Sequence, residues 1–244
     1  MRVMLFDTET DGLIINPESQ VQPRMVEIFL MVAEQTGFGP EAQFEELGSW
    51  QTLINPGRLM KDDIIAIHHI TNEMVVAPEV PTFRQIAPLL IKFINKSDRV
   101  VAHNAMFDVE MVNIELARTM NDGPWQPPQW PEIWCTVEQT EHWFQHKLPL
   151  GASKGKTGLY PLLFQESYKD RHRAEADVRA LYECYKRCEH MNWNWTEAST
   201  ETVPDREEKE SAYAVSTTTT TGLPGGPQLD DASAGGVHQP ALLP

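Results

Sequence analysis

The chain has 244 residues, of which 41% are hydrophobic, and its 20 basic and 35 acidic residues give a net charge of −15. This composition supports a globular core and excludes a protein that coats nucleic acid through its overall charge. The apolar runs, such as residues 86–94, are too short for a membrane span, and the N-terminus lacks the features of a secretory signal, so we expect a cytoplasmic protein without membrane partners.

The order of the predicted elements indicates an α/β fold. Strand-like runs lie at 3–7, 25–34 and 44–54, and their spacing favours an antiparallel three-strand meander. Helical patterns follow at 81–95, 105–120, 136–145 and 174–191, with a short strand at 99–103. The last helix carries apolar residues at a spacing of three and four, which predicts a core-facing stripe. Together these elements predict a mixed central sheet flanked by helices.

The composition changes at about residue 196 to a segment rich in Thr, Ser, Gly, Pro and Glu. Such a segment buries too little apolar surface to offset its ordering entropy. We therefore expect one folded domain over residues 1–195 and a disordered, low-complexity tail over residues 196–244.

Basic residues gather at 147–173, where six Lys and Arg side chains outnumber two acids. The region includes GASKGKTG at 151–158, which has three residues where a P-loop needs four before its Gly-Lys pair. Lys154 and Lys156 are instead candidates for holding the phosphates of a nucleic acid strand. A solvated loop without function is an equally good interpretation.

The first strand leads into Asp7 and Glu9, with no Lys or Arg in residues 5–12. Because side chains two apart in a strand face the same way, Asp7 and Glu9 share a face with Leu5, while Phe6 faces the other side. A solvated acidic turn would explain such a pair if it stood alone.

Two further acids lie near the starts of helices, Asp108 in the helix at 105–120 and Asp177 in the helix at 174–191. Carboxylates at the ends of strands and the starts of helices can converge on one point, where they would repel one another. A divalent cation with a preference for oxygen ligands, Mg²⁺ or Mn²⁺, would remove that repulsion. The pattern therefore predicts a metal site.

Three segments, FDTETDGL, VAHNAMFDVE and HRAEADV, resemble in this order the exonuclease motifs of the DnaQ-like 3′ to 5′ exonucleases. The histidine five residues before the last Asp, His172, is typical of the DEDDh branch, since the sibling branch has Tyr where this chain has Arg173. Segments 67–71 and 158–168 are similar to a loop of these enzymes and to the approach to the third motif. The resemblance covers about residues 1–190 and implies a ribonuclease H-like fold.

The resemblance also implies roles for the five motif residues. Two Mg²⁺ or Mn²⁺ ions would share one site, with Asp7 bridging both. Glu9 and Asp177 would complete the ion that holds the attacking water, Asp108 would serve the second ion, and His172 would take the proton from the water. Because five residues turn a helix by about 140°, we place His172 in the loop before the helix rather than within it.

Other residues are substrate-binding candidates by the same resemblance. Thr10, Leu13 and Phe107 would contact the terminal nucleotide, with the apolar pair against its base. Core packing is an equally good account of Phe107. Asn104 joins this group and is also a candidate N-cap of the second-motif helix.

The leading functional hypothesis is a metal-dependent exonuclease that hydrolyses 3′ ends of single-stranded or frayed DNA and releases nucleoside 5′-monophosphates, with proofreading in trans as a setting. The alternatives are an RNA 3′-end trimming exonuclease and a catalytically silent module that binds nucleic acid or a replisome. Residues 239–244, QPALLP, are similar to peptides that bind bacterial sliding clamps. A sliding clamp or a DNA polymerase is therefore a candidate partner of the tail, with a plain linker as the default.

Overall fold

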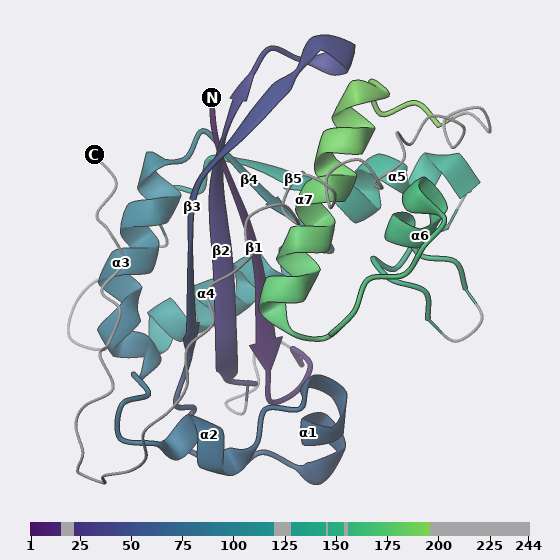
Figure 1. Cartoon of the computed structure of the whole chain (residues 1–244). Helices are drawn as coiled ribbons and strands as arrows, with labels where there is room; N and C mark the ends of the chain where they lie inside the picture. The colour runs from purple at the N-terminus through teal and green to yellow at the C-terminus, as the bar shows by residue number, and fades with distance from the viewer. Residues whose placement is uncertain (16–21, 120–127, 145, 154–155, 196–244) are drawn as a thin grey trace, which may run out of the picture. The chain divides into compact units, whose positions relative to one another are not determined.

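The computed structural model describes residues 1–15, 22–119, 128–144, 146–153 and 156–195 (Figure 1). These residues belong to one compact unit, Met1–Glu201. The expected tail at 196–244 lies outside the described residues, as does Lys154.

The elements follow the predicted order with several additions. The strands are β1 Arg2–Thr10, β2 Met25–Thr36, β3 Gln43–Leu53, β4 Arg99–Ala102 and β5 Glu132–Cys135. The helices are α1 Asp62–His68, α2 Asn72–Val76, α3 Phe83–Lys96, α4 Ala105–Thr119, α5 Thr136–Phe144, α6 Leu159–Phe164 and α7 Ala174–His190, and a 3-10 turn, η1, lies at Gly39–Glu41.

The strands form one mixed sheet in the order β3-β2-β1-β4-β5. β1, β2 and β3 pair antiparallel, which confirms the predicted meander, and β4 and β5 add in parallel beside β1. This is the mixed sheet with flanking helices that the sequence predicts for a ribonuclease H-like α/β fold.

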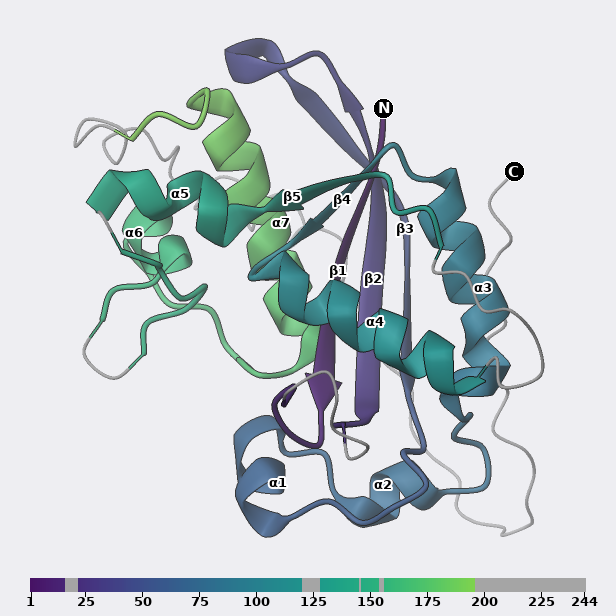
Figure 2. The ribbon, with the colours of Figure 1, turned by 180° about the vertical axis from the view of Figure 1, so that it is seen from behind.

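Helices cover both faces of the sheet (Figures 1 and 2). One face packs Met4 and Phe6 of β1 against α3 and α4, and the other packs Val3 and Leu5 against α6 and α7. The alternation along β1 therefore follows the two-residue period of a strand. It directs Asp7 and Glu9 to the face on which α7 lies.

In the part of the chain that the structure describes, one edge of β1 has no strand paired with it where the acidic residues lie. β2 pairs with β1 from Arg2 to Thr10, whereas β4 pairs only with Val3 to Leu5. The chain then leaves the sheet and begins α4 at Ala105. The stretch of β1 that carries Asp7 and Glu9 is therefore exposed to the N-terminal end of α4 on the side where no strand pairs with it.

Some expectations about the local structure were wrong. Residues 67 and 68, expected in a loop, are the last residues of α1, which begins with Asp62 and Asp63 and ends where His69 adopts a left-handed backbone. Acids in the first turn stabilise a helix N-terminus, and a left-handed residue ends it. β1 also extends past residue 7 to Thr10 because β2 continues to pair with it.

Among the described residues, every helix is too short or too polar to cross a membrane.

Candidate active site

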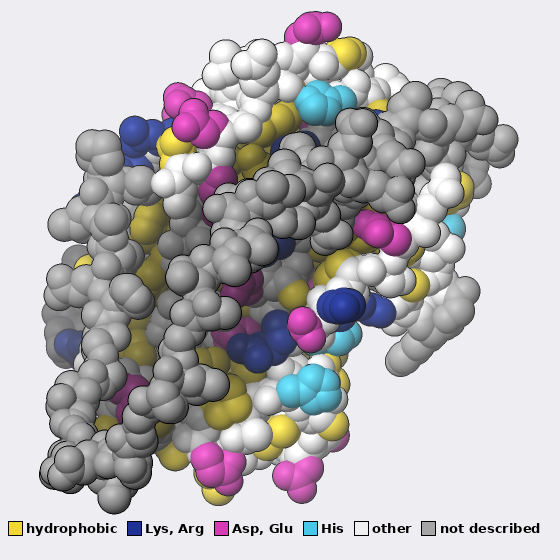
Figure 3. Space-filling view, in the orientation of Figure 1, with side chains coloured by type: hydrophobic (Ala, Val, Ile, Leu, Met, Phe, Trp, Pro, Cys, Tyr) yellow, Lys and Arg dark blue, Asp and Glu magenta, His cyan; other side chains and the backbone are white. Residues whose placement is uncertain are grey.

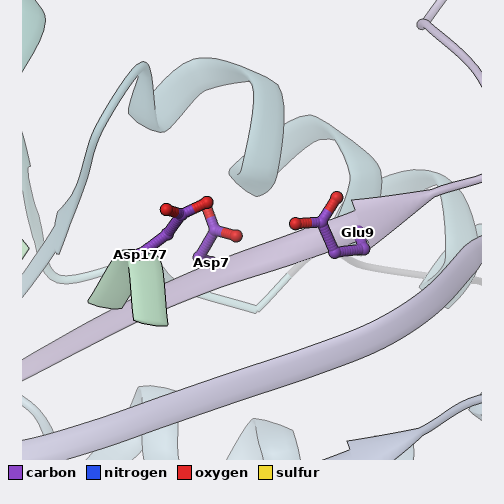
Figure 4. A group of neighbouring side chains, drawn as sticks. All are labelled: Asp7, Glu9 and Asp177. Atoms are coloured by element: carbon purple, nitrogen blue, oxygen red, sulfur yellow. The ribbon is translucent and has the colours of Figure 1, made fainter. Parts of the chain in front are cut away.

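Three carboxylates from two elements meet at the end of β1. Asp7 and Glu9 on β1 and Asp177 in the first turn of α7 each offer an oxygen, and these oxygens all lie within 4.8 Å of one another. Figure 4 shows the three carboxyl groups on the same side of the β1 ribbon, with those of Asp7 and Asp177 close together. The tertiary structure thus brings together acids that are 170 residues apart in sequence.

Asp108 lies beside this group and is held by β1 itself. Its Oδ1 accepts hydrogen bonds from the Thr8 backbone N–H at 3.1 Å and from the Thr8 hydroxyl at 2.7 Å. The unpaired edge of β1 thereby supplies the N–H that fixes Asp108. The first motif gives Thr8, which lies between Asp7 and Glu9, no role of its own. The structure shows that this residue orients Asp108, one of the four acids.

The acids are crowded enough to disfavour their ionised forms. Burial, followed by the charges of Asp108 and Glu9, raises the pKa of Asp7 well above its ordinary value. Burial and the charges of Asp177 and Glu27 raise the pKa of Glu9 to about 8. The pKa of Asp108 rises to about 7 through burial, although the two bonds from Thr8 oppose that rise. Glu9 would hold a proton at neutral pH, and the ionised forms of Asp7 and Asp108 are disfavoured as well, unless a cation occupied the space between the acids.

The donor set fits a hard divalent cation. Three carboxylates offer oxygens within one small volume, and such oxygens are the ligands that Mg²⁺ and Mn²⁺ prefer. Arg173, whose charge slightly opposes the rise in the pKa of Glu9, forms its ion pair with Glu27 at 2.7 Å. The cluster therefore keeps an excess of negative charge that a metal ion can neutralise.

His172 lies in the loop before α7, as the sequence analysis predicts. Its side chain is exposed, its φ is 64°, and its backbone N–H donates a hydrogen bond of 3.1 Å to Asp177 Oδ2. A left-handed residue turns the chain sharply. This turn keeps His172 next to Asp177 without placing both on one helix.

A tyrosine that the motifs do not mark also contacts the site. The hydroxyl of Tyr168 donates a hydrogen bond of 2.6 Å to Asp177 Oδ1. Asp177 is therefore held on both oxygens, by Tyr168 and by the His172 backbone. Tyr168 lies in the segment 158–168 that resembles the approach to the third motif, which was the available signal in the sequence.

The comparison with protein families decides the assignment. A family model described as an exonuclease matches residues 4–185, which include all five motif residues. The chain belongs to the DnaQ-like exonuclease family.

Relatives and solved structures agree with this family. The DNA polymerase III subunit epsilon of Treponema pallidum is 32% identical over 181 residues, which cover 74% of this chain and 73% of that protein. Two solved structures share the fold, a 3′-exonuclease that recognises a histone mRNA stem-loop (TM-score 0.55, 13% identity) and an Escherichia coli ExoI–ssDNA complex with zinc bound (TM-score 0.53, 16% identity). The matches cover 78% and 76% of this chain but only 63% and 39% of those chains.

The substrate-binding candidates of this chain lie in different surroundings. Leu13 is 79% exposed, which leaves its side chain available to a ligand, whereas Phe107 is half-buried against the core. The Thr10 hydroxyl donates to the Gly12 carbonyl at 2.7 Å and shapes the turn after β1. Asn104 is exposed and directly precedes α4, but its φ of 67° departs from the extended backbone that is typical of an N-cap.

The basic segment of this chain is joined to the third motif. Ser153 and Lys156 exchange two backbone hydrogen bonds, and the side chain of Lys156 is exposed. The Arg171 guanidinium donates to the Ala152 carbonyl. Figure 3 shows Lys, Arg and His side chains near the loop that leads into α7 and near α1, with acidic side chains among them.

Proposed function

We propose that this chain is a divalent-metal-dependent 3′ to 5′ exonuclease that acts on single-stranded or frayed DNA ends. The observation that carries the proposal is the convergence of Asp7, Glu9 and Asp177 within 4.8 Å, with Asp108 and His172 adjacent. The relative named DNA polymerase III subunit epsilon favours DNA as the substrate.

The residues of the site divide the work between holding metal ions and moving a proton. Asp7, Glu9 and Asp177 would hold one ion, and Asp7 and Asp108 a second. Divalent ions bound there would stabilise the attacking and leaving oxygens of an in-line phosphoryl displacement. His172, exposed and next to Asp177, would accept the proton of the attacking water. The products would be a nucleoside 5′-monophosphate and a strand shortened by one nucleotide.

Exposed and half-buried groups around the site would bind the strand. Leu13 and Phe107 would contact the terminal base, with Thr10 and Asn104 beside them. Lys154, outside the described residues, and Lys156 would hold phosphates further along the strand.

The test uses 5′-labelled single-stranded DNA and RNA of the same sequence, incubated with the purified chain in Mg²⁺ and then in EDTA. The proposal predicts a ladder that shortens DNA from the 3′ end only when Mg²⁺ is present. Preferential shortening of RNA would identify an RNA-trimming exonuclease instead. Shortening of neither strand, with binding retained, would identify a silent module. The Asp7→Ala variant controls for a contaminating nuclease.

We further propose that the tail links this nuclease to a DNA polymerase or a sliding clamp, so that it proofreads in trans. The support is the sequence QPALLP at 239–244. A pull-down of a bacterial sliding clamp by the full chain, compared with a variant carrying Leu242→Ala and Leu243→Ala, tests this. Equal capture by both chains would contradict it.

A further inference from the structure

A fifth carboxylate, Glu27, lies next to the acidic cluster. Glu27 on β2 is paired with Glu9 on β1 in the sheet register, and it is fully buried. Its charge contributes to the raised pKa of both Asp7 and Glu9. A buried carboxylate beside two other acids requires partners of its own.

Four hydrogen bonds use both oxygens of Glu27. Oε1 accepts from Arg173 Nη2 at 2.7 Å and from Gln51 Nε2 at 3.0 Å. Oε2 accepts from Arg173 Nε at 3.2 Å and from the Ala174 backbone N–H at 3.1 Å. A carboxylate offers about four lone pairs, so all of them have donors. Glu27 therefore has no lone pair left for a metal ion. It is a neighbour of the proposed metal ligands and not one of them.

Two of these contacts hold the start of α7. Arg173 is the N-cap residue of α7 and makes no capping hydrogen bond with its own side chain. Ala174 supplies the first N–H of the helix, and this N–H donates a hydrogen bond to Glu27, which lies on β2. The first N–H groups of a helix need such partners when they are buried. Glu27 thus replaces a local cap and connects β2 to the turn between His172 and Asp177.

We propose that Glu27 and Arg173 form a positioning pair, which fixes the His172 turn and the first turn of α7 so that His172 and Asp177 face Asp7 and Glu9. The inference rests on the proposed nuclease function. It assigns Arg173, which stands where the sibling branch has Tyr, to orienting the neighbouring residues rather than to contacting the substrate. Neither Glu27 nor Arg173 belongs to the proposed metal ligands.

The arginine side chain is specifically suited to this task. Nε and Nη2 of Arg173 contact the two oxygens of Glu27 in a fork, which fixes orientation as well as charge. A lysine would keep the charge but would act as a point charge without the fork. Arg173→Lys therefore removes the orientation while preserving the electrostatics. Arg179→Lys is a matched control, because Arg179 lies on the same helix and pairs with Glu175 and Glu46 at the surface.

The experiment measures kcat, KM and Tm of the full chain on single-stranded DNA, and amide hydrogen exchange of residues 172–177 without metal. Loss of a group that holds a metal ligand in place typically reduces activity by about 10 to 100-fold. We expect Arg173→Lys to lower kcat by about tenfold or more with KM and Tm unchanged, and to speed exchange at 172–177. Arg179→Lys should match the unmodified chain in all of these measurements.

Glu27→Gln provides a second test of the pair. It should lower kcat at least as much as Arg173→Lys does, because it also replaces an oxygen that accepts from Gln51 or from the Ala174 N–H. The double variant should be no worse than Glu27→Gln alone, because Glu27→Gln already disrupts the pairing with Arg173. Unchanged kcat and exchange in Arg173→Lys, or global unfolding of that variant, would overturn the inference. An unmodified chain without nuclease activity would overturn the proposed function instead, and the exchange measurement would still decide whether the pair orders the turn.

Discussion

The backbone N–H of His172 donates a hydrogen bond to the carboxylate of Asp177, five residues later and one turn into α7. Two residues at this separation would lie on different sides of one regular helix. The positive φ of His172 keeps it outside the helix and directs the chain back toward Asp177. Proton acceptor and metal ligand are therefore neighbours through a turn, and several predictions depend on this geometry and on the charges around it.

Replacement of the exposed histidine should affect the reaction and not the fold. His172→Gln is expected to lower kcat by about 10² to 10⁴-fold, the usual contribution of a general base. The Tm should not change, because the side chain is exposed. His69→Gln is a matched control, since His69 is also exposed with a positive φ. Equal loss of activity in both variants would contradict the assigned role.

Asp7→Asn should abolish cleavage while leaving the protein folded. Loss of about 4 kcal/mol of transition-state stabilisation by the metal ions corresponds to about a thousandfold decrease in rate. Removal of one acid from the crowded group should leave the metal-free Tm unchanged or higher, because burial and the neighbouring acids disfavour the Asp7 anion. Retained cleavage, measured on labelled single-stranded DNA, would refute the site assignment.

Stability of the metal-free protein should fall as the pH rises through the neutral range. The pKa of Glu9 is raised from 4.5 to about 8, so between these values folded Glu9 keeps a proton that the unfolded chain has lost. Stability is therefore present at low pH and is lost as the pH approaches 8. Buried His103, with its pKa lowered to about 4, acts in the opposite direction below its ordinary value of 6.5.

The opposing effect of His103 is small above pH 6.5, so the measurement compares Tm at pH 6.5 with Tm at about pH 8.5, in EDTA and in Mg²⁺. We expect a decrease of a few degrees in EDTA and a smaller one in Mg²⁺, because bound cations favour the ionised carboxylates. A Tm that rises over this interval in EDTA would contradict the crowding of the acids.

Removal of the Tyr168 hydroxyl should weaken metal binding. Tyr168→Phe leaves Asp177 Oδ1 without its 2.6 Å donor, and the Mg²⁺ concentration for half-maximal activity should rise by about tenfold. Tyr160→Phe is the control, because the Tyr160 ring contacts that of Tyr168 but its hydroxyl donates to Glu166 at 3.2 Å. An unchanged Mg²⁺ requirement in Tyr168→Phe would remove this residue from the site.

A close backbone approach at Gly158 should make alanine destabilising there. A Cβ at Gly158 would lie under 3.0 Å from backbone atoms of Leu150 and Gly151, which cannot move aside as a flexible side chain would. We expect Gly158→Ala to lower the free energy of unfolding by about 1–3 kcal/mol in urea denaturation. Gly12→Ala, whose Cβ would meet only an ordinary contact with Pro23, should change it by less than about 0.5 kcal/mol.

The elements that the sequence predicts well are those with a long, local pattern. The three-strand meander and the helices around 83–96, 105–119 and 174–190 follow from periodicity and turn residues, and the structure confirms them within a few residues. The sequence did not predict α1, because this helix is short and has little apolar periodicity. β5 was not predicted from the sequence, and it is a strand because it pairs in register with β4.

The sequence by itself determined the order of the acids, the position of His172 before its helix and the family, because motifs and residue spacing are properties of the chain alone. The tertiary structure decided which groups hold those acids. Thr8 orients Asp108 across 100 residues, and Glu27 binds Arg173 across 146. These contacts depend on which strands are neighbours and in which register, and hydrogen bonds act only over about 3 Å, so no local pattern can encode them.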